Sequence, residues 1–179
     1  SEVEKIKEDL KRLLDEVRKK AEELKRENRE LLRRLHELSK KIIRELEKLL
    51  EELADLVRKG RSDDKVVKRI RDELEKLKRE YERAVKELRD RNRELNEELK
   101  RVLERVKEDM DRLREEVRRR GKEDEDLERT IREVEKELRR LLEDYRRESK
   151  KVHEDIDEDR RRLEDAVREV EKEIEKVRR

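Results

Sequence analysis

The stretch RKGRSDDKVV, residues 58–67, decides how this chain is divided into helices. Gly60 follows a basic turn and precedes the acidic pair Asp63 and Asp64. Glycine readily adopts the left-handed conformation that ends a helix, cations favour the carboxyl end of the helix dipole, and Ser or Asp caps the next helix. The stretch therefore predicts one helix that ends at Gly60 and a second that is capped by Ser62 or Asp63.

A second glycine stretch, RRRGKEDEDL at residues 118–127, repeats this chemistry. Gly121 follows three arginines and precedes an acidic run, so we expect a third helix capped near Asp124. The first residues, SEVE, have the pattern of a capping box, in which Ser1 and Glu4 satisfy each other's free backbone donors. The predicted helices are about 2–59, 63–120 and 124–179.

Apolar side chains recur at helical spacing through all three segments. The stripe of the first segment begins Val3, Ile6, Leu10, and its average step is about 3.5 residues, between a coiled coil and a straight helix. We therefore expect near-straight coiled-coil helices, each about 58 residues long, with a weak supercoil. Pairs such as Ile42 and Ile43 widen the stripe, as a helix with two neighbours requires.

Short loops between long helices make sequential helices antiparallel neighbours. The sequence thus predicts an all-α fold, an up-down-up antiparallel three-helix bundle, with residues 1–179 as a single domain. Because one chain supplies the whole core, we expect a monomer with no partner. Capped helices and short loops also predict a thermostable protein.

The composition excludes several classes of protein. Charged residues make up 64% of the chain and hydrophobic residues 30%, a balance typical of disorder, but the strict apolar spacing favours long helices. The net charge is +2 and the signs alternate along the chain, so no basic stripe indicates a nucleic-acid partner. No apolar run is long enough to predict a targeting signal, a transmembrane helix or a membrane partner, so we expect a soluble protein. The absence of cysteine excludes disulfides and thiolate metal sites.

Polar residues interrupt the apolar stripe of all three helices at one level. If the turns centre near the two glycines, residues at the same height along the first two helices have numbers that sum to about 122. A residue of the third helix then has a number about 122 larger than the first-helix residue at the same height. An unpaired buried polar group costs about 1–3 kcal/mol, so a coincident layer predicts mutual hydrogen bonding. The predicted structural polar layer is Asn28, Asn92, Ser149 and His153, with Asn96 at its margin.

A second candidate layer contains His36 and Ser39 with Asp159, whose carboxylate would hold the imidazole in one tautomer. In the alternative interpretation, His36, Ser39 and Asn96 lie at the boundary of the core and face water. Tyr81 and Tyr145 occupy stripe positions. They are expected to pack in the core, with their hydroxyls directed outward or towards a polar neighbour.

The histidines do not indicate catalysis or metal binding. A zinc site needs three or four ligands at about 2 Å, whereas His36 and His153 differ by about five residues in level, roughly 7–8 Å. Ser149 and His153 are neighbours on one helix of a narrow bundle, without a cleft for a substrate. We therefore predict no catalytic residue, no metal, no cofactor and no enzymatic activity.

These features together resemble one known class of protein. The GRSDD and GKEDED turns, the equal helices, the Glu/Lys/Arg surface and the polar layers are similar to those of de novo designed helical bundles with buried hydrogen-bond networks. That resemblance implies a structural scaffold with no biochemical activity, in which polar layers set register and pairing specificity. The alternative is a natural coiled-coil spacer or tether, or a helix-binding interaction module. A spacer normally has irregular apolar patches and uneven helices, which this sequence lacks.

Overall fold

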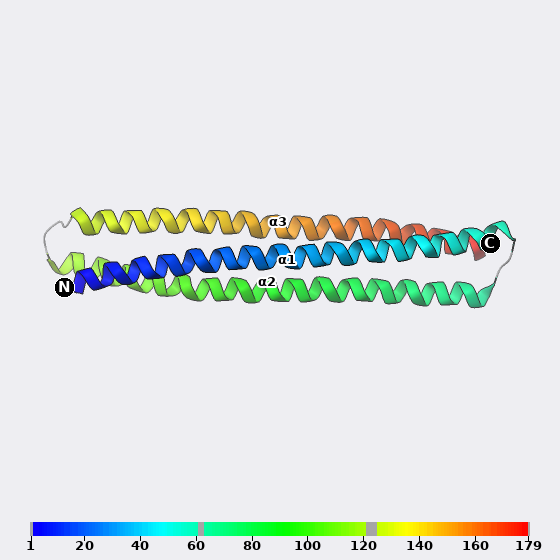
Figure 1. Ribbon diagram of the computed structural model, residues 1–179, viewed down its shortest axis with the longest axis horizontal. Coiled ribbons are helices and arrows are strands. Elements are labelled where there is room, and N and C mark those ends of the chain that lie inside the picture. Colours follow the sequence, from blue (N-terminus) through cyan, green and yellow to red (C-terminus); the bar gives the residue numbers. More distant parts are fainter. Residues whose placement is uncertain (1, 61–62, 121–124, 179) are drawn as a thin grey trace. The chain divides into compact units, whose positions relative to one another are not determined.

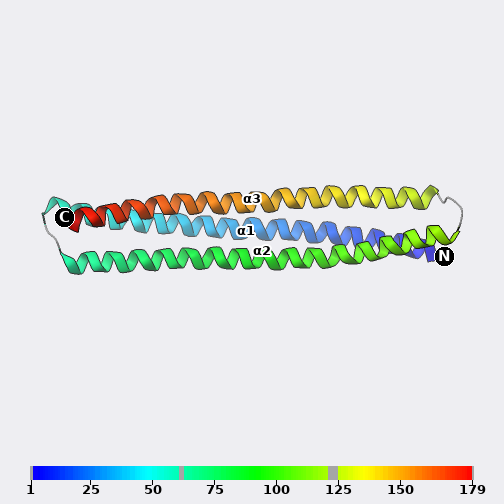
Figure 2. The same ribbon diagram turned by 180° about the vertical axis from the view of Figure 1, so that it is seen from behind.

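The chain forms three helices in a computed structural model, which describes residues 2–60, 63–120 and 125–178. They are α1 (Glu2–Arg58), α2 (Asp64–Arg120) and α3 (Glu125–Arg178) (Figures 1 and 2). The described residues contain no strand. The predicted all-α three-helix bundle is confirmed, and the predicted helix bounds are right to within one residue. The predicted caps at Ser1, Ser62 and Asp124, and the helix stop at Gly121, lie outside the described residues.

The turn after α1 has the expected chemistry. Gly60 has a φ of +60°, and its backbone N–H donates to the Val57 carbonyl at 3.1 Å. A Cβ added at Gly60 would meet nothing within 4 Å, so the left-handed backbone alone favours glycine there. Asp63 Oδ1 accepts a hydrogen bond from the Lys65 backbone N–H at 3.1 Å. Of the two predicted caps, Asp63 is therefore an N-cap of α2, which begins one residue later.

The structure divides into two compact units, each with a part of all three helices. The first unit is Ser1–Asn28 with Arg91–Lys151, and the second is Arg29–Asp90 with Val152–Arg179. The single domain expected over residues 1–179 stays a prediction.

Ion pairs within each unit show the direction of the helices. In the first unit, Glu16 pairs with Arg105 and Glu27 with Arg91, so rising numbers on α1 meet falling numbers on α2. In the second unit, Glu82 of α2 pairs with Arg160 of α3 at 2.6 Å. His36 of α1 lies 3.0 Å from Asp159 of α3, an offset of 123 residues. The predicted up-down-up order is thus present in the contacts.

Each unit has its own apolar core, built from the predicted stripes. Val85 and Val167 are buried, while their neighbours Ala84 and Ala166 are half-buried. Valine removes more apolar surface from water than alanine does, so the helix turns the valine inward. The buried apolar side chains of the first unit are Leu10, Val17, Ala21, Leu24, Leu95, Leu99, Val102, Val106, Met110, Leu113, Leu127, Val134 and Tyr145.

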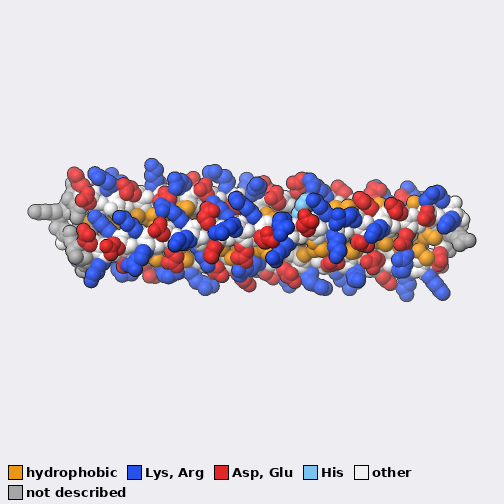
Figure 3. All heavy atoms as spheres, viewed as in Figure 1, with side chains coloured by type: hydrophobic (Ala, Val, Ile, Leu, Met, Phe, Trp, Pro, Cys, Tyr) orange, Lys and Arg blue, Asp and Glu red, His pale blue; other side chains and the backbone are white. Residues whose placement is uncertain are grey.

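Charged side chains of both signs are interspersed over the face drawn in Figure 3, with hydrophobic side chains visible between them. Most ion pairs lie within one helix, three or four residues apart, and are largely exposed. Such pairs add little to stability individually, so the cores must carry most of it. Among the described helices, none is long and apolar enough to cross a membrane.

Candidate functional site: polar side chains in the two cores

Three asparagines and one tyrosine form a chain of hydrogen bonds in the first unit, which we call the amide relay. The Tyr145 hydroxyl of α3 donates to Asn96 Oδ1 on α2. Asn96 Nδ2 donates to Asn92 Oδ1 at 3.3 Å, and Asn92 Nδ2 donates to Asn28 Oδ1 on α1 at 2.9 Å. Asn28 and Asn92 are only 2% and 3% exposed, so the relay joins all three helices through the core of this unit.

The amide relay has one direction. Each asparagine accepts on its oxygen, and Asn96 and Asn92 direct their NH2 groups to the next residue. The relay ends at Asn28 Nδ2, which is buried and has no hydrogen-bond partner among the described residues. The sequence contains three asparagines and no glutamine, so the relay uses every carboxamide in the chain.

The structure brings together some of the residues predicted for the first polar layer. Asn28, Asn92 and Asn96 are joined, whereas no hydrogen bond of the described residues links half-buried Ser149 to them. His153 is exposed, which corrects its predicted place in the layer. It directly follows buried Val152, and one helical step of about 100° turns it away from the core.

Tyr145 supplies the α3 contact that sequence reasoning assigned to Ser149 and His153. The residue was expected to pack and is only 9% exposed, but its hydroxyl also donates into the relay. The sequence left open whether this hydroxyl points outward or towards a polar neighbour, and in the structure it points towards a polar neighbour. The signal was present in the sequence, since Tyr145 lies one helical turn before Ser149. Burial raises the pKa of the Tyr145 phenol above its ordinary value.

The second unit holds a different polar cluster. His36 Nδ1 of α1 lies 3.0 Å from Asp159 Oδ1 of α3. Asp159 is 7% exposed, and the His36 side chain is 41% exposed, so one edge of the ring reaches water. A neutral imidazole with its proton on Nδ1 can donate to the carboxylate, which would fix that tautomer.

Ser39 lies near this pair in sequence but not in its hydrogen bonding. It is 2% exposed, and none of the hydrogen bonds between described residues joins it to His36 or Asp159. The boundary interpretation therefore suits His36, which is partly exposed, and does not suit Ser39, which is buried.

Tyr81 of α2 completes the polar cluster of the second unit. Its side chain is 1% exposed, and its hydroxyl has no hydrogen-bond partner among the described residues. Burial, and then the nearby negative charge of Asp159, raise the pKa of Tyr81 to about 12. From the sequence, Tyr81 was expected only to pack in the core. Its height along the helices corresponds to about residue 41 of α1, which is within about one turn of Ser39 and Asp159.

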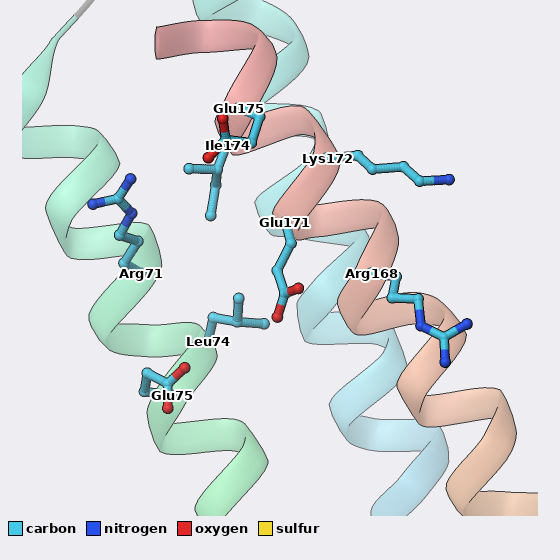
Figure 4. A pocket seen from close by; sticks show the side chains of 8 residues that line it. All are labelled: Arg71, Leu74, Glu75, Arg168, Glu171, Lys172, Ile174 and Glu175. Carbon is cyan, nitrogen blue, oxygen red and sulfur yellow. The ribbon is translucent and has the colours of Figure 1, made fainter.

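The surface also has an open groove between two helices. The groove in Figure 4 lies between α2 and α3 of the second unit, with buried Leu74 and Ile174 facing one another and Lys172 extending away. Glu171 on its rim pairs with Lys78 at 3.7 Å. Among the described residues, no group of three or more His, Cys, Asp or Glu side chains could hold a metal ion. The residues that line the groove are Arg71, Leu74, Glu75, Arg168, Glu171, Lys172, Ile174 and Glu175.

Comparisons with known proteins give one named likeness. No family model matches the chain, and no curated protein matches it. Among solved structures, the chain is similar to a computationally designed three-helix bundle, with 22% sequence identity and a TM-score of 0.32. The match covers 99% of this chain and 86% of that chain.

Proposed function

We propose that the chain is a designed structural scaffold without biochemical activity, in which buried polar residues set the register and pairing of the helices. The observation that carries this proposal is the hydrogen bond from Asn92 Nδ2 to Asn28 Oδ1, 2.9 Å long and almost fully buried. It joins α2 to α1 inside an otherwise apolar core. Such a bond contributes to specificity more than to stability.

The physical reason lies in what a slipped helix would lose. An apolar stripe with a regular step can move along its neighbour by one or two turns and still bury similar surface. An amide that slips from its partner is left buried and unpaired, at a cost of about 1–3 kcal/mol. Because Asn92 donates to Asn28 of α1 and Asn96 accepts from Tyr145 of α3, a slip of α2 against either helix breaks the relay.

The polar pair of the second unit supports the same role between other helices. His36 and Asp159 join α1 to α3, and a shift of either helix by one turn would leave the Asp159 carboxylate buried without that partner. A buried carboxylate that loses its partner costs more than an amide does. The surface ion pairs are largely exposed and discriminate less between registers.

The proposal is tested by replacing both members of the buried amide pair with leucine. We expect the parent chain to be a monomer of 22.4 kDa, because one chain supplies three helices to each core. The double variant Asn28→Leu with Asn92→Leu should resist denaturant better than the parent. It should also populate slipped or intermolecular pairings, seen as extra species in analytical ultracentrifugation and doubled amide signals in NMR spectra.

Thr130→Val is the matched control for this experiment. It removes a polar group from the first unit, but the Thr130 hydroxyl bonds only to its own helix, at the Asp126 carbonyl. This control should remain one monomeric species. If the leucine double variant also stays a single monomer with one set of amide signals, the polar residues do not set register and the proposal is wrong.

A further inference from the structure

The amide relay ends in a buried donor that the protein itself does not satisfy. Asn28 is 2% exposed, and its Nδ2 has no partner among the described residues. A buried N–H group without an acceptor costs about 1–3 kcal/mol, so an acceptor beside it has a clear energetic advantage. The closest carboxylate along α1, Glu27, is already 2.6 Å from Arg91 Nε and is committed to that cation.

Reversing the Asn28 amide would not remove the problem. In the structure the Tyr145 hydroxyl donates to Asn96 Oδ1, Asn96 Nδ2 donates to Asn92 Oδ1, and Asn92 Nδ2 donates to Asn28 Oδ1. A reversed Asn28 would direct its own NH2 group at the Asn92 NH2 group and leave its oxygen unpaired. The direction of the relay therefore leaves a donor, and not an acceptor, at its α1 end.

The helix register places one free polar side chain of α3 near that donor. Tyr145 contacts Asn96, and Asn92 lies four residues before Asn96 on α2. Because α2 and α3 are antiparallel, the residue four positions after Tyr145, which is Ser149, lies level with Asn92. Arg18 of α1 is hydrogen-bonded to Glu137 of α3, an offset of 119 residues. The same offset places Asn28 within about one turn of the height of Ser149.

We propose that a single water molecule binds beside Asn28, accepts a hydrogen bond from Asn28 Nδ2 and donates one to Ser149 Oγ. Buried waters typically bridge polar groups that the protein leaves unsatisfied, and they need two to four polar partners. Ser149 is half-buried, so it can hold the inner water and still receive a hydrogen bond from solvent. The water would extend the relay to a second position on α3.

This inference rests on the proposed role of the amide relay, but it fails separately from that role. The Asn92 to Asn28 hydrogen bond sets register whether or not a water occupies the next position. A test that detects the water directly, with the Asn92 NH2 group as an internal reference, separates the two.

NMR spectroscopy of the ¹⁵N-labelled full chain provides that test, because the chain has only three carboxamides to assign. In water-selective NOE and ROE spectra, the Asn28 NH2 protons should show a cross-peak to a long-lived water. The Asn92 NH2 proton that is bonded to Asn28 should show slow exchange and a downfield shift. Absence of the water cross-peak at Asn28 overturns the water site, while a slowly exchanging Asn92 NH2 leaves the proposed function intact.

Two serine variants and one threonine variant assign the second partner. Ser149→Ala should abolish the Asn28 water cross-peak and speed exchange of the Asn28 NH2 protons about tenfold or more, with the Asn92 signal unchanged. Ser39→Ala, a buried serine of the second unit, and Thr130→Ala, a hydroxyl bonded within α3, are matched controls that should leave the cross-peak in place. A cross-peak that persists at full intensity in Ser149→Ala shows that Ser149 does not hold the water, and overturns its assigned role.

Discussion

The two units build their polar clusters from different chemistry. In the first unit, neutral amides and a phenol donate in series, from Tyr145 to Asn28. In the second, a histidine meets a buried carboxylate, and the Tyr81 hydroxyl stays unpaired near that charge. Both arrangements tie helices together at a defined level. The neutral relay does so without a net charge to desolvate, whereas the His36 and Asp159 pair brings ionisation into the core.

The difference also concerns the two tyrosines. Tyr145 and Tyr81 are both largely buried, and burial raises the pKa of each. Of these two hydroxyls, that of Tyr145 alone has a hydrogen-bond partner among the residues that the structure describes. The same residue type therefore supports a polar cluster in one unit and leaves an unsatisfied group in the other, and substitutions should reveal this contrast in stability.

The largest effect is expected from breaking the relay in the first unit. Asn92→Ala removes the partner of Asn28 Oδ1 and of Asn96 Nδ2, and we expect the free energy of unfolding to fall by about 2–4 kcal/mol. Chemical denaturation followed by circular dichroism measures it. Arg93→Ala, at the next and exposed position, is the control and should stay within about 0.5 kcal/mol. If Asn92→Ala and Asn92→Asp both stay within about 0.3 kcal/mol of the parent, Asn92 is a solvated boundary residue.

The second prediction uses alkaline pH to test the unpaired tyrosine of the second unit. Its pKa is raised from the ordinary 10.0 to about 12, so above pH 10 the folded state holds a proton that the unfolded state has released. The stability that the protonated Tyr81 phenol contributes is fully present below pH 10 and is lost as the pH rises to about 12. At about 1.4 kcal/mol for each pKa unit, the parent should lose about 2–3 kcal/mol relative to Tyr81→Phe across that range.

Denaturation of the parent and Tyr81→Phe at pH 9 and pH 11.5 provides this comparison, because the deprotonation of lysines is common to both proteins. Titration of tyrosinate absorbance in Tyr145→Phe then reports Tyr81 alone. A Tyr81 midpoint near its ordinary value, with parallel stability curves, would show that its hydroxyl reaches water.

The third prediction compares the tyrosines directly by removing each hydroxyl. At neutral pH, Tyr145→Phe leaves Asn96 Oδ1 without its donor and should lower the free energy of unfolding by about 1 kcal/mol. Tyr81→Phe removes a buried group that has no partner and should raise it by about 1 kcal/mol. The two substitutions are chemically identical, so each is the control for the other. Changes of the same sign would contradict the assigned hydrogen bonding.

Much of this structure could be predicted from the sequence because its signals are local and periodic. The two glycine stretches divided the chain into helices, and the apolar stripe identified nearly all the buried positions, from Leu10 to Ile174. The numbers of Asn28 and Asn92, and of His36 and Asp159, placed each pair at one level before the structure did.

Other features depend on the directions in which side chains point, and residue numbers do not give these directions. His153 was predicted from residue numbers alone, but a helix turns about 100° with each residue, and the side chain that follows buried Val152 is exposed. Tyr145 enters the relay because its long side chain carries the hydroxyl to Asn96, which a count by levels does not capture. The direction of the relay, and hence the unpaired Asn28 Nδ2, follows from donors and acceptors in three dimensions.

The smallest effect is expected from the ion pair next to the relay. Arg91 and Glu27 each precede a relay asparagine by one residue and lie 2.6 Å apart, but their side chains are 39% and 38% exposed. The hydrogen bond to Glu27 raises the pKa of Arg91 above its ordinary value, so the guanidinium stays charged. Arg91→Gln should lower stability less than Asn92→Ala or Tyr145→Phe does. In 1 M NaCl, which weakens solvent-exposed ion pairs, that loss should shrink. The loss in Asn92→Ala should not change with salt, because the relay carries no net charge. If both losses shrink equally in denaturation at the two salt concentrations, the relay is as solvated as the ion pair beside it.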